Sequence, residues 1–162
     1  MNIAHKLHRL LQLNNEAFIG ELYRSLLDRE PDPGGAAGHA HQLRTGTSKY
    51  RIMTGFLLSD EALALYSRRQ PVSGGEHVCG DLQRLFAKKD DSFVGDLFRY
   101  ILLRAPDTAS YGNYIGMLRS GQSRASLFAG FVLSDEFQQL ITLDKYAFAR
   151  RSLDQLILSF YN

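Results

Sequence analysis

The sequence predicts an all-α fold: two tandem copies of a roughly five-short-helix unit, related by a pseudo-twofold, plus a C-terminal closing helix. Residues 18–65 and 93–140 are identical at 19 of 48 positions, at a constant offset of 75, whereas chance gives about three. Apolar residues recur at helical spacing in both copies, and no segment shows the sustained alternation of a strand. We therefore expect copy one at 1–69, a linker at 70–80, copy two at 81–143 and the C-terminal helix at 144–162.

The first two helices of each copy are predicted from repeated apolar patterns. A Leu-x-Arg-Leu pattern at 7–10 recurs at 82–85 and indicates a short opening helix. Asn15 and Asp90 are expected to cap the second helix, because their side chains accept hydrogen bonds from free amides of a first turn. Its apolar stripe consists of Phe18, Ile19, Leu22, Tyr23, Leu26 and Leu27 in copy one, and of Phe93, Val94, Leu97, Phe98, Ile101 and Leu102 in copy two.

The third helix follows a Pro-Asp turn in each copy. Pro31 and Pro106 disfavour helical geometry at the preceding residue and are expected to stop the second helix. Asp32 and Asp107 then cap the next helix, with Pro33 suited to its first position. Each third helix is expected to end near a glycine that tolerates the left-handed conformation, at Gly46 and Gly121.

Serines predict the starts of the remaining helices. Ser48 and Ser123 are placed to cap the fourth helix, and the Ser-Asp-Glu triplets at 59–61 and 134–136 are placed to begin the fifth. The chain then turns to Pro, Ser and Gly between Gln70 and Gly80, as is typical of a linker. The C-terminal segment places Leu153, Leu156, Ile157 and Phe160 on one helical face, which suits a closing helix or, as the alternative, a contact with a partner.

Composition excludes several classes of function. The formal net charge is +2, from 19 basic and 17 acidic residues without a long run of one sign, which argues against a nucleic-acid surface. The single cysteine, Cys79, lies in the expected linker and requires no oxidising compartment. The N-terminus lacks the features of a signal peptide, and no apolar run is long enough to span a bilayer, so we expect a cytoplasmic protein unless the chain is a module of a larger one.

Signatures of catalysis and of metal binding are missing. The sequence contains no phosphate-binding glycine loop, no Gly-x-Ser-x-Gly elbow, no His-Glu-x-x-His helix and no Cys-x-x-Cys pair, so we expect no enzyme, with a small enzyme as the third alternative. His39 and His41 are two apart, which directs them to different sides of a helix, and no further ligand follows at a known spacing. We expect no metal and no cofactor.

The order of these motifs resembles a known family. A Leu-rich helix with an aromatic residue, Arg-x-Pro-Asp at 29–32 and 104–107, a Leu before a Gly, and Gly-Phe-x-x-Ser-x-Glu at 55–61 and 130–136 together resemble the bacterial family catalogued as domain of unknown function 4214. That family is similar to the phycobilisome linker domain and is found attached to glycosyltransferases, adhesins and repeat-rich secreted proteins. The resemblance implies an accessory or binding module, in surroundings often concerned with glycans.

The two copies differ most after the Pro-Asp turn. The family usually has Gly-Leu-x-x-Trp there, whereas this chain, which has no Trp, has His39 in copy one and Tyr114 in copy two. Because Tyr111 and Tyr114 are three residues apart and are expected to share a helical face, copy two is the better binding candidate. The difference predicts different roles for the two copies.

The Arg and Asp of each turn have two interpretations. Arg29 with Asp32, and Arg104 with Asp107, suit hydrogen bonds to sugar hydroxyls or to an anionic group. Alternatively, each Asp caps the next helix while the Arg pairs with a carboxylate such as Glu61 or Glu136, and their presence in both copies favours this structural clamp.

We therefore predict a non-catalytic helical module that recognises a glycan or assists a glycosyltransferase in bacterial surface-polysaccharide or glycoprotein assembly. Its predicted ligand-binding residues are Tyr111, Tyr114, Arg104, Asp107, His39, Arg29 and Asp32. The alternative is a protein–protein scaffold or linker module that binds a partner through its C-terminal helix.

Overall fold

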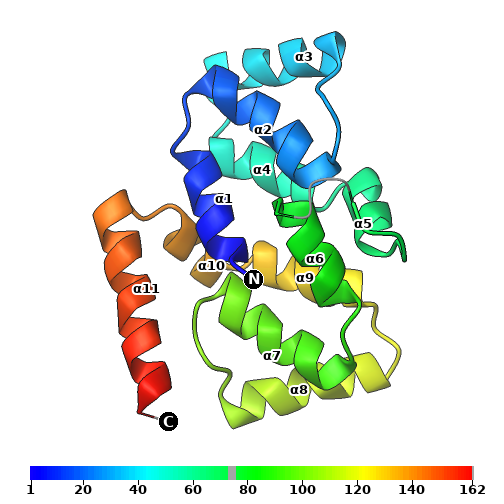
Figure 1. The fold of residues 1–162 in the computed structure, drawn as a ribbon, viewed down its shortest axis with the longest axis vertical. Helices are drawn as coiled ribbons and strands as arrows, with labels where there is room; N and C mark the ends of the chain where they lie inside the picture. Colours follow the sequence, from blue (N-terminus) through cyan, green and yellow to red (C-terminus); the bar gives the residue numbers. More distant parts are fainter. Residues whose placement is uncertain (73–75, 162) are drawn as a thin grey trace. The chain divides into compact units, whose positions relative to one another are not determined.

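The computed structural model describes residues 1–72 and 76–161, and within these ranges it contains eleven α-helices and no strand (Figure 1). Each copy contributes five helices, and a further helix follows, as predicted. Copy one holds α1 (Ile3–Leu11), α2 (Asn15–Leu27), α3 (Pro33–Arg44), α4 (Lys49–Leu57) and α5 (Asp60–Tyr66). Copy two holds α6 (Val78–Phe86), α7 (Asp90–Ile101), α8 (Thr108–Arg119), α9 (Arg124–Val132) and α10 (Asp135–Ile141), and α11 (Lys145–Phe160) ends the chain.

Most of the predicted helix starts and stops are confirmed. Asp32 and Asp107 cap α3 and α8 by accepting hydrogen bonds from the amides of Gly35 and Ser110. The glycines after these two helices have φ of 100° and 101°, in the left-handed region. The serines predicted to cap helices accept hydrogen bonds from amides of the first turn in each case: Ser48, Ser59, Ser123 and Ser134.

The start of α2 and α7 was predicted one residue too late. Asn14, not Asn15, caps α2 by accepting a hydrogen bond from the Ala17 amide. In copy two the capping position is Lys89, whose side chain makes no such bond, and Asp90 is the first helical residue. A capping residue needs extended backbone, and the chain adopts it one position before the polar side chain that the pattern suggested.

The ends of α2 and α7 do not depend on the prolines. The helix α2 ends at Leu27, Asp28 has a left-handed φ of 52°, and the Arg29 amide donates to the Tyr23 carbonyl. In copy two the Arg104 amide likewise donates to the Phe98 carbonyl. This left-handed turn ends the helix before the proline and brings the arginine back alongside it.

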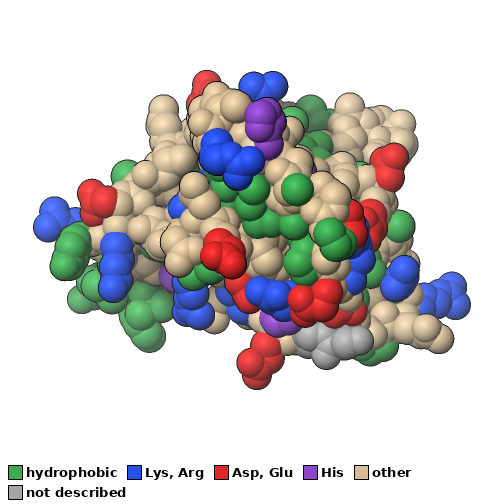
Figure 2. Space-filling view, turned by 90° about the horizontal axis from the view of Figure 1, so that it is seen from above, with side chains coloured by type: hydrophobic (Ala, Val, Ile, Leu, Met, Phe, Trp, Pro, Cys, Tyr) green, Lys and Arg blue, Asp and Glu red, His purple; other side chains and the backbone are tan. Residues whose placement is uncertain are grey.

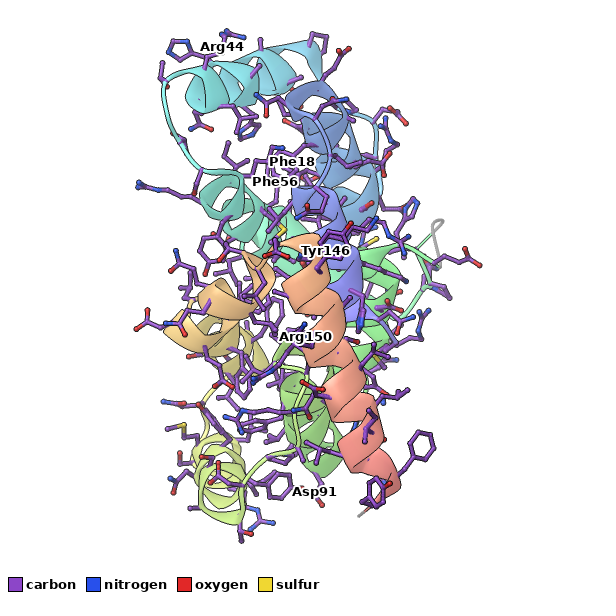
Figure 3. The ribbon with its side chains drawn as sticks, turned by 90° about the vertical axis from the view of Figure 1, so that its left-hand side faces the viewer. Phe18, Arg44, Phe56, Asp91, Tyr146 and Arg150 are labelled. Carbon is purple, nitrogen blue, oxygen red and sulfur yellow. The ribbon has the colours of Figure 1, made fainter. Side chains whose placement is uncertain are left out.

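The compact units differ from the sequence copies. The chain divides into a unit at Met1–Ala87 and a unit at Lys88–Asn162, so α6, the first helix of copy two, packs within the first unit against α1, α2 and α5. Because α6 begins at Val78, the end of the predicted linker is helical; residues 73–75 lie outside the described part. In the first unit, Phe18 and Phe56 lie in the core (Figure 3).

The side chain of Gln83 fixes α6 to the segment that follows α5. Its Oε1 accepts a hydrogen bond from the Val72 amide at 3.2 Å, and its Nε2 donates to the carbonyls of Arg68 and Gln70 at 3.0 and 2.7 Å. These bonds satisfy backbone groups of the segment after α5, which lies outside any helix. The Gln83 side chain thus provides the hydrogen bonds that regular secondary structure would otherwise provide to residues 68–72.

The second unit comprises α7 to α11, with a core rich in aromatic residues. The helix α7 packs against α8 and α9, and α9 packs against α10. The largest side chains fully buried in these helices are Phe93, Phe98, Phe128 and Phe137. This core supports the α7–α8 turn, which carries Arg104 and Asp107.

The C-terminal segment is helical, as predicted, but most of its apolar face is not covered. Within α11, Phe148 is the buried residue, whereas Leu153, Leu156, Ile157 and Phe160 are 53–80% exposed. In the described part of the chain, this apolar face is therefore largely exposed, and α11 does not close a core with it. Tyr146, also exposed, and Arg150 lie along the same helix (Figure 3).

Charged side chains of both signs are interspersed on the face shown in Figure 2, as the sequence suggested. None of the helices in the described part of the chain combines the length and apolar composition needed to cross a membrane.

The thiol of Cys79 is expected to be unreactive in the folded protein. Cys79 is fully buried in α6, and burial raises the pKa of its thiol to about 11, because the charged thiolate loses its hydration. Ellman's reagent at mildly alkaline pH should therefore modify Cys79 only after unfolding in urea. Rapid modification of the native protein would contradict the packing of α6 in the first unit.

Candidate functional site

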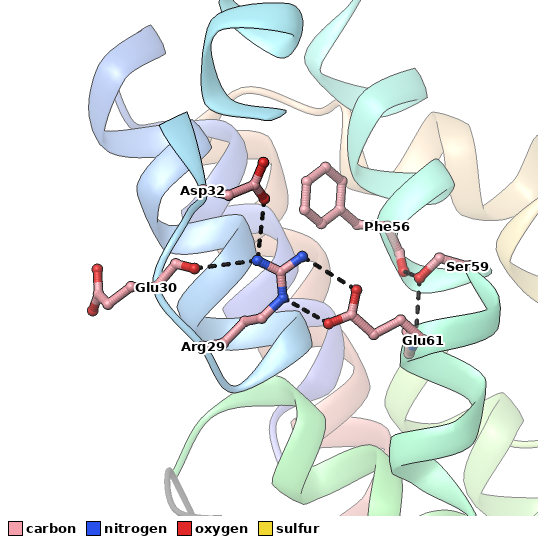
Figure 4. Close-up of polar contacts among 7 residues, drawn as sticks. Arg29, Glu30, Asp32, Phe56, Ser59 and Glu61 are labelled. Atoms are coloured by element: carbon pink, nitrogen blue, oxygen red, sulfur yellow. Dashed lines mark hydrogen bonds and ion pairs between the residues drawn. The ribbon is translucent and has the colours of Figure 1, made fainter. Parts of the chain in front are cut away.

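An arginine clamp joins α2, the Pro-Asp turn and α5 in copy one (Figure 4). Arg29 Nε donates to Glu61 Oε1 at 2.7 Å, and its Nη2 donates to Oε2 at 3.3 Å. Its Nη1 donates to Asp32 Oδ1 and to the Glu30 carbonyl, at 3.3 and 3.2 Å. The guanidinium therefore joins the Glu61 carboxylate of α5 to two groups of the turn, as the forked donors of Arg favour.

The same clamp is present in copy two. Arg104 Nε donates to Glu136 Oε1 at 2.5 Å and its Nη2 to Oε2 at 3.2 Å, while Asp107 lies further off, at 3.9 Å from Nη1. The hydrogen bonds that the arginines donate to Glu61 and Glu136 raise the pKa of both guanidiniums. The structural interpretation of the turn is confirmed, because these guanidiniums are already bound to carboxylates of their own copy.

An aromatic cluster lies next to each clamp, at equivalent positions. In copy one, His39 from α3 packs against Tyr23 and Phe56, with ring centroids 6.2 and 4.9 Å away. In copy two, Tyr114 packs against Phe98 and Phe131 at 5.7 and 5.0 Å. The position at which the family usually has Trp is therefore filled by a ring that packs on the second and fourth helices.

A pocket of about 440 Å³ opens beside the copy-one cluster, between α2, α3, α4 and the start of α5. Tyr23, His39 and Phe56 give it aromatic lining, and His39 Nδ1 lies 2.9 Å from Gln42 Oε1. Arg51 is exposed at the pocket, and no acidic side chain in the described part of the chain pairs with it. The polar residues that line the pocket are Arg29, Gln42, Thr47, Arg51, Ser59 and Glu61.

The equivalent positions of copy two are less polar. Under the offset of 75, Gln42 corresponds to Met117, Arg51 to Ser126, and Tyr23 to Phe98. Three polar or charged groups of the copy-one pocket are thus replaced by an apolar side chain, a short hydroxyl and a ring without a hydroxyl.

The two tyrosines predicted as a binding pair have different neighbours. Tyr114 is part of the aromatic cluster, whereas the Tyr111 hydroxyl donates to the Asp91 carbonyl at the start of α7, at 3.2 Å. The two rings thus have separate contacts within copy two, and their joint binding of a sugar stays a prediction. Spacing along α8 placed them within about one turn of each other, but their side chains pack on different parts of α7.

Two pocket residues were missed by the sequence prediction. Gln42 and Arg51 lie outside the repeated motifs, which drew attention to the turn. The signal that identifies them is the difference between the copies, at positions 42 and 117 and at positions 51 and 126. His39 and Arg29, which were predicted, do line the pocket, and Asp32 lies beside it as a cap and partner of Arg29.

The two histidines of α3 have separate surroundings. His39 lies in the aromatic cluster, and His41 is exposed on another side of the helix. Within residues 1–72 and 76–161, no group of three or more His, Cys, Asp or Glu side chains is arranged to hold a metal ion.

Acid is expected to weaken the caps of α3 and α8. The Ser110 amide lowers the pKa of the Asp107 carboxyl, and the Gly35 amide, followed by Arg29, lowers that of Asp32. Since the folded-state pKa lies below the ordinary value of 3.8, the stabilisation is complete above that pH and is lost as the pH falls towards the folded-state pKa. The melting temperature should therefore drop in this acidic range.

The Asp107→Asn variant tests this expectation, because Asn also caps helices but does not titrate. At neutral pH it should melt close to the wild type, whereas Asp107→Ala should melt lower. Below about pH 4 the wild type should lose more stability than Asp107→Asn. Parallel acid profiles of the two proteins would show that the Asp107 carboxylate contributes nothing to the fold.

Comparison with known proteins gives one match. The family model described as Domain of unknown function (DUF4214) matches the chain twice, over residues 6–66 and 82–141. The two matches coincide with the two sequence copies rather than with the two compact units. No match was found among curated proteins or among solved structures.

Proposed function

Because the chain belongs, through both of its copies, to the family described as Domain of unknown function (DUF4214), we propose that it is a non-catalytic binding module that recognises a glycan through copy one. The observation that carries the proposal is the pocket beside His39, which combines aromatic rings with convergent polar groups. This combination suits a sugar, whose ring has apolar faces and a rim of hydroxyls. In this proposal the module serves a glycosyltransferase or the assembly of a surface polysaccharide or glycoprotein.

The clamp has a supporting role in this proposal. Arg29 and Glu61 hold each other at 2.7 Å, so they form a fixed wall of the pocket. Gln42 and Arg51 have donors that this clamp does not occupy. We assign to these two side chains the hydrogen bonds to sugar hydroxyls, and to His39 the contact with the sugar ring.

Copy two has the architectural role in this proposal. Its clamp and aromatic cluster have the same geometry, but Met117 and Ser126 replace the two polar residues assigned to the ligand. Tyr114 contributes to the cluster and Tyr111 to the packing of α8 on α7. Function is therefore assigned to the positions at which the copies differ.

A glycan array followed by calorimetry tests the proposal. Gln42→Met, which introduces the copy-two residue, should weaken binding of the array hit at least tenfold while leaving helicity unchanged. The matched control is Met117→Gln, which should leave binding at the wild-type level. If no sugar binds at millimolar concentration, or if Gln42→Met binds as the wild type does, the proposed function is wrong.

The second candidate function is a protein–protein scaffold, and the exposed apolar face of α11 favours it. Leu153, Leu156, Ile157 and Phe160 lie on one side of a long helix and are more than half exposed. Apolar side chains that gather on one exposed helical face are typical of docking surfaces. The likeness of the family to the phycobilisome linker domain would imply the same role.

The Leu156→Glu variant distinguishes this candidate from the first. It should abolish the association of the chain with a stoichiometric protein partner, measured by sedimentation, and leave sugar binding intact. Retained association in this variant would exclude α11 as the scaffold surface.

A further inference from the structure

A second hollow of copy one lies on the other side of α3. It is a groove of about 810 Å³ between α3 and the N-terminal half of α2, and it shares no lining residue with the pocket beside His39. Its floor is made of small side chains, with Ala17 and Gly20 from α2 and Ala36 and Ala40 from α3. Arg44, at the C-terminal end of α3, lies at one border of the groove (Figure 3).

Copy two contains the equivalent groove in a filled form. Six lining positions correspond under the offset of 75, and they lie at 16, 17, 20, 24, 31 and 36 in copy one and at 91, 92, 95, 99, 106 and 111 in copy two. Ala36 is replaced by Tyr111, and Ala40 is replaced by the buried Ile115. The remaining hollow is smaller, about 490 Å³.

The Tyr111 side chain defines what the groove accepts. Its hydroxyl donates to the backbone carbonyl of Asp91, in the first turn of α7, at 3.2 Å (Asp91 is labelled in Figure 3). In copy one, the carbonyl of Glu16 occupies the equivalent position, and the Ala36 side chain stops at its methyl group. Copy one thus keeps the acceptor and the surrounding positions but lacks the ring.

We propose that the copy-one groove is a binding site for a tyrosine side chain of a partner protein, whose phenol ring takes the place that Tyr111 fills in copy two. The ring packs on Ala36 and Ala40, beside the Arg24 guanidinium that covers Gly20, and its hydroxyl donates to the Glu16 carbonyl. This inference does not depend on the glycan site, because the two hollows have no residue in common.

The charges at the groove favour a neutral phenol over an anionic ligand. Arg24, which borders it, already binds Glu21 and Glu30, each at 3.0 Å. Its charge is therefore compensated within copy one, and the two other charged residues that line the groove, Glu16 and Arg44, have opposite signs. The acceptor in the first turn requires a donor, which a phenol hydroxyl supplies and a phosphate or carboxylate does not.

The test uses 4-methylphenol as the probe, with toluene as the analogue that lacks the hydroxyl. In the 162-residue chain, 4-methylphenol at millimolar concentration should shift the amide resonances of residues 16–20 and 36–40, and toluene should shift them less. Millimolar affinity is what about eight heavy atoms provide at ordinary ligand efficiency. N-acetyl-tyrosine amide should shift the same resonances, which ties the probe to a protein side chain.

Two reciprocal variants provide the decisive comparison. Ala36→Tyr introduces the copy-two ring and should abolish the shifts while the melting temperature is retained. If this variant fails to fold, Ala40→Ile, which introduces the copy-two residue at that position and adds less volume than Tyr, should weaken the shifts. Tyr111→Ala should lower the melting temperature and create a second 4-methylphenol site in copy two. Added 4-methylphenol should then restore part of the lost melting temperature. The proposal is overturned if the shifts persist in both copy-one variants, or if toluene causes equal shifts. It is also overturned if 4-methylphenol stabilises Tyr111→Ala but does not shift residues 16–20.

Discussion

Replacing Lys6 with Met is expected to lower the free energy of unfolding by about 3 kcal/mol, at the low end of the range for breaking a buried ion pair. Lys6 Nζ donates to Asp81 Oδ2 at 2.8 Å, and the Asp81 side chain is only 2% exposed. Without Lys6 the buried carboxylate keeps Arg84 as its partner, which moderates the loss. Urea unfolding followed by circular dichroism measures the effect.

This pair also explains a difference between the copies. Lys6 and Asp81 occupy equivalent positions, 75 residues apart, in α1 and α6, and these helices pack against each other. Two identical charges at this contact would repel each other. The opposite charges therefore allow a helix of copy two to pack in the first unit.

Two controls separate the buried pair from a general loss of charge. The double variant Lys6→Met with Asp81→Leu should recover much of the stability, because an apolar pair of similar volume is tolerated where an unpaired charge is not. Glu30→Gln, which removes an exposed partner of Arg24, should cost less than about 1 kcal/mol. An unfolding midpoint unchanged by Lys6→Met would contradict the α1–α6 contact.

Replacing Gly35 with Ser should destabilise copy one by about 1–3 kcal/mol, although copy two has Ser110 at the same position. A Cβ atom at Gly35 would lie 2.3 Å from the Tyr23 hydroxyl, which is too close for any side chain. Tyr23 is 3% exposed, and its ring is held by Phe56, with ring centroids 5.0 Å apart, and by the Arg29 guanidinium, 4.9 Å from its centroid. In copy two the equivalent of Tyr23 is Phe98, so no hydroxyl meets Ser110.

The two positions should therefore be coupled. Tyr23→Phe removes the hydroxyl, and the double variant Gly35→Ser with Tyr23→Phe should recover most of the loss, with a coupling of about 0.5–3 kcal/mol in thermal unfolding. Ser110→Gly in copy two is the matched control and should cost about 1 kcal/mol, since it changes helix propensity and removes an exposed hydrogen bond between the Ser110 side chain and Asp107. Additive effects of Gly35→Ser and Tyr23→Phe would show that the hydroxyl is not what excludes a side chain at position 35.

Local chemistry made much of the fold predictable. The caps at Asp32 and Ser48, and the left-handed Gly46, act within one or two helical turns, so residue types at fixed spacing identify them. The pairing of Arg29 with Glu61 spans 32 residues and was predictable because the same two positions recur in copy two.

Long-range packing was not predictable in the same way. The packing of α6 in the first unit depends on contacts of Asp81 and Gln83 with copy one. The apolar pattern of α6 alone is compatible with packing against either copy. The exposed face of α11 shows the same ambiguity, because amphipathic spacing does not say what covers it. For the site, spacing along α8 suggested one tyrosine surface, whereas the neighbours on α7 direct Tyr111 and Tyr114 to different places.

The most direct test of the account is where a bound sugar lies. We expect titration of the isotopically labelled chain with the array hit to shift the amide resonances of residues 39–61 around the copy-one pocket, with those of His39, Gln42 and Arg51 among the largest. Resonances around the copy-two equivalents at 114–136 should remain in place. Shifts centred on Tyr111 and Tyr114, or equal shifts in both copies, would contradict the assignment of binding to the pocket beside His39.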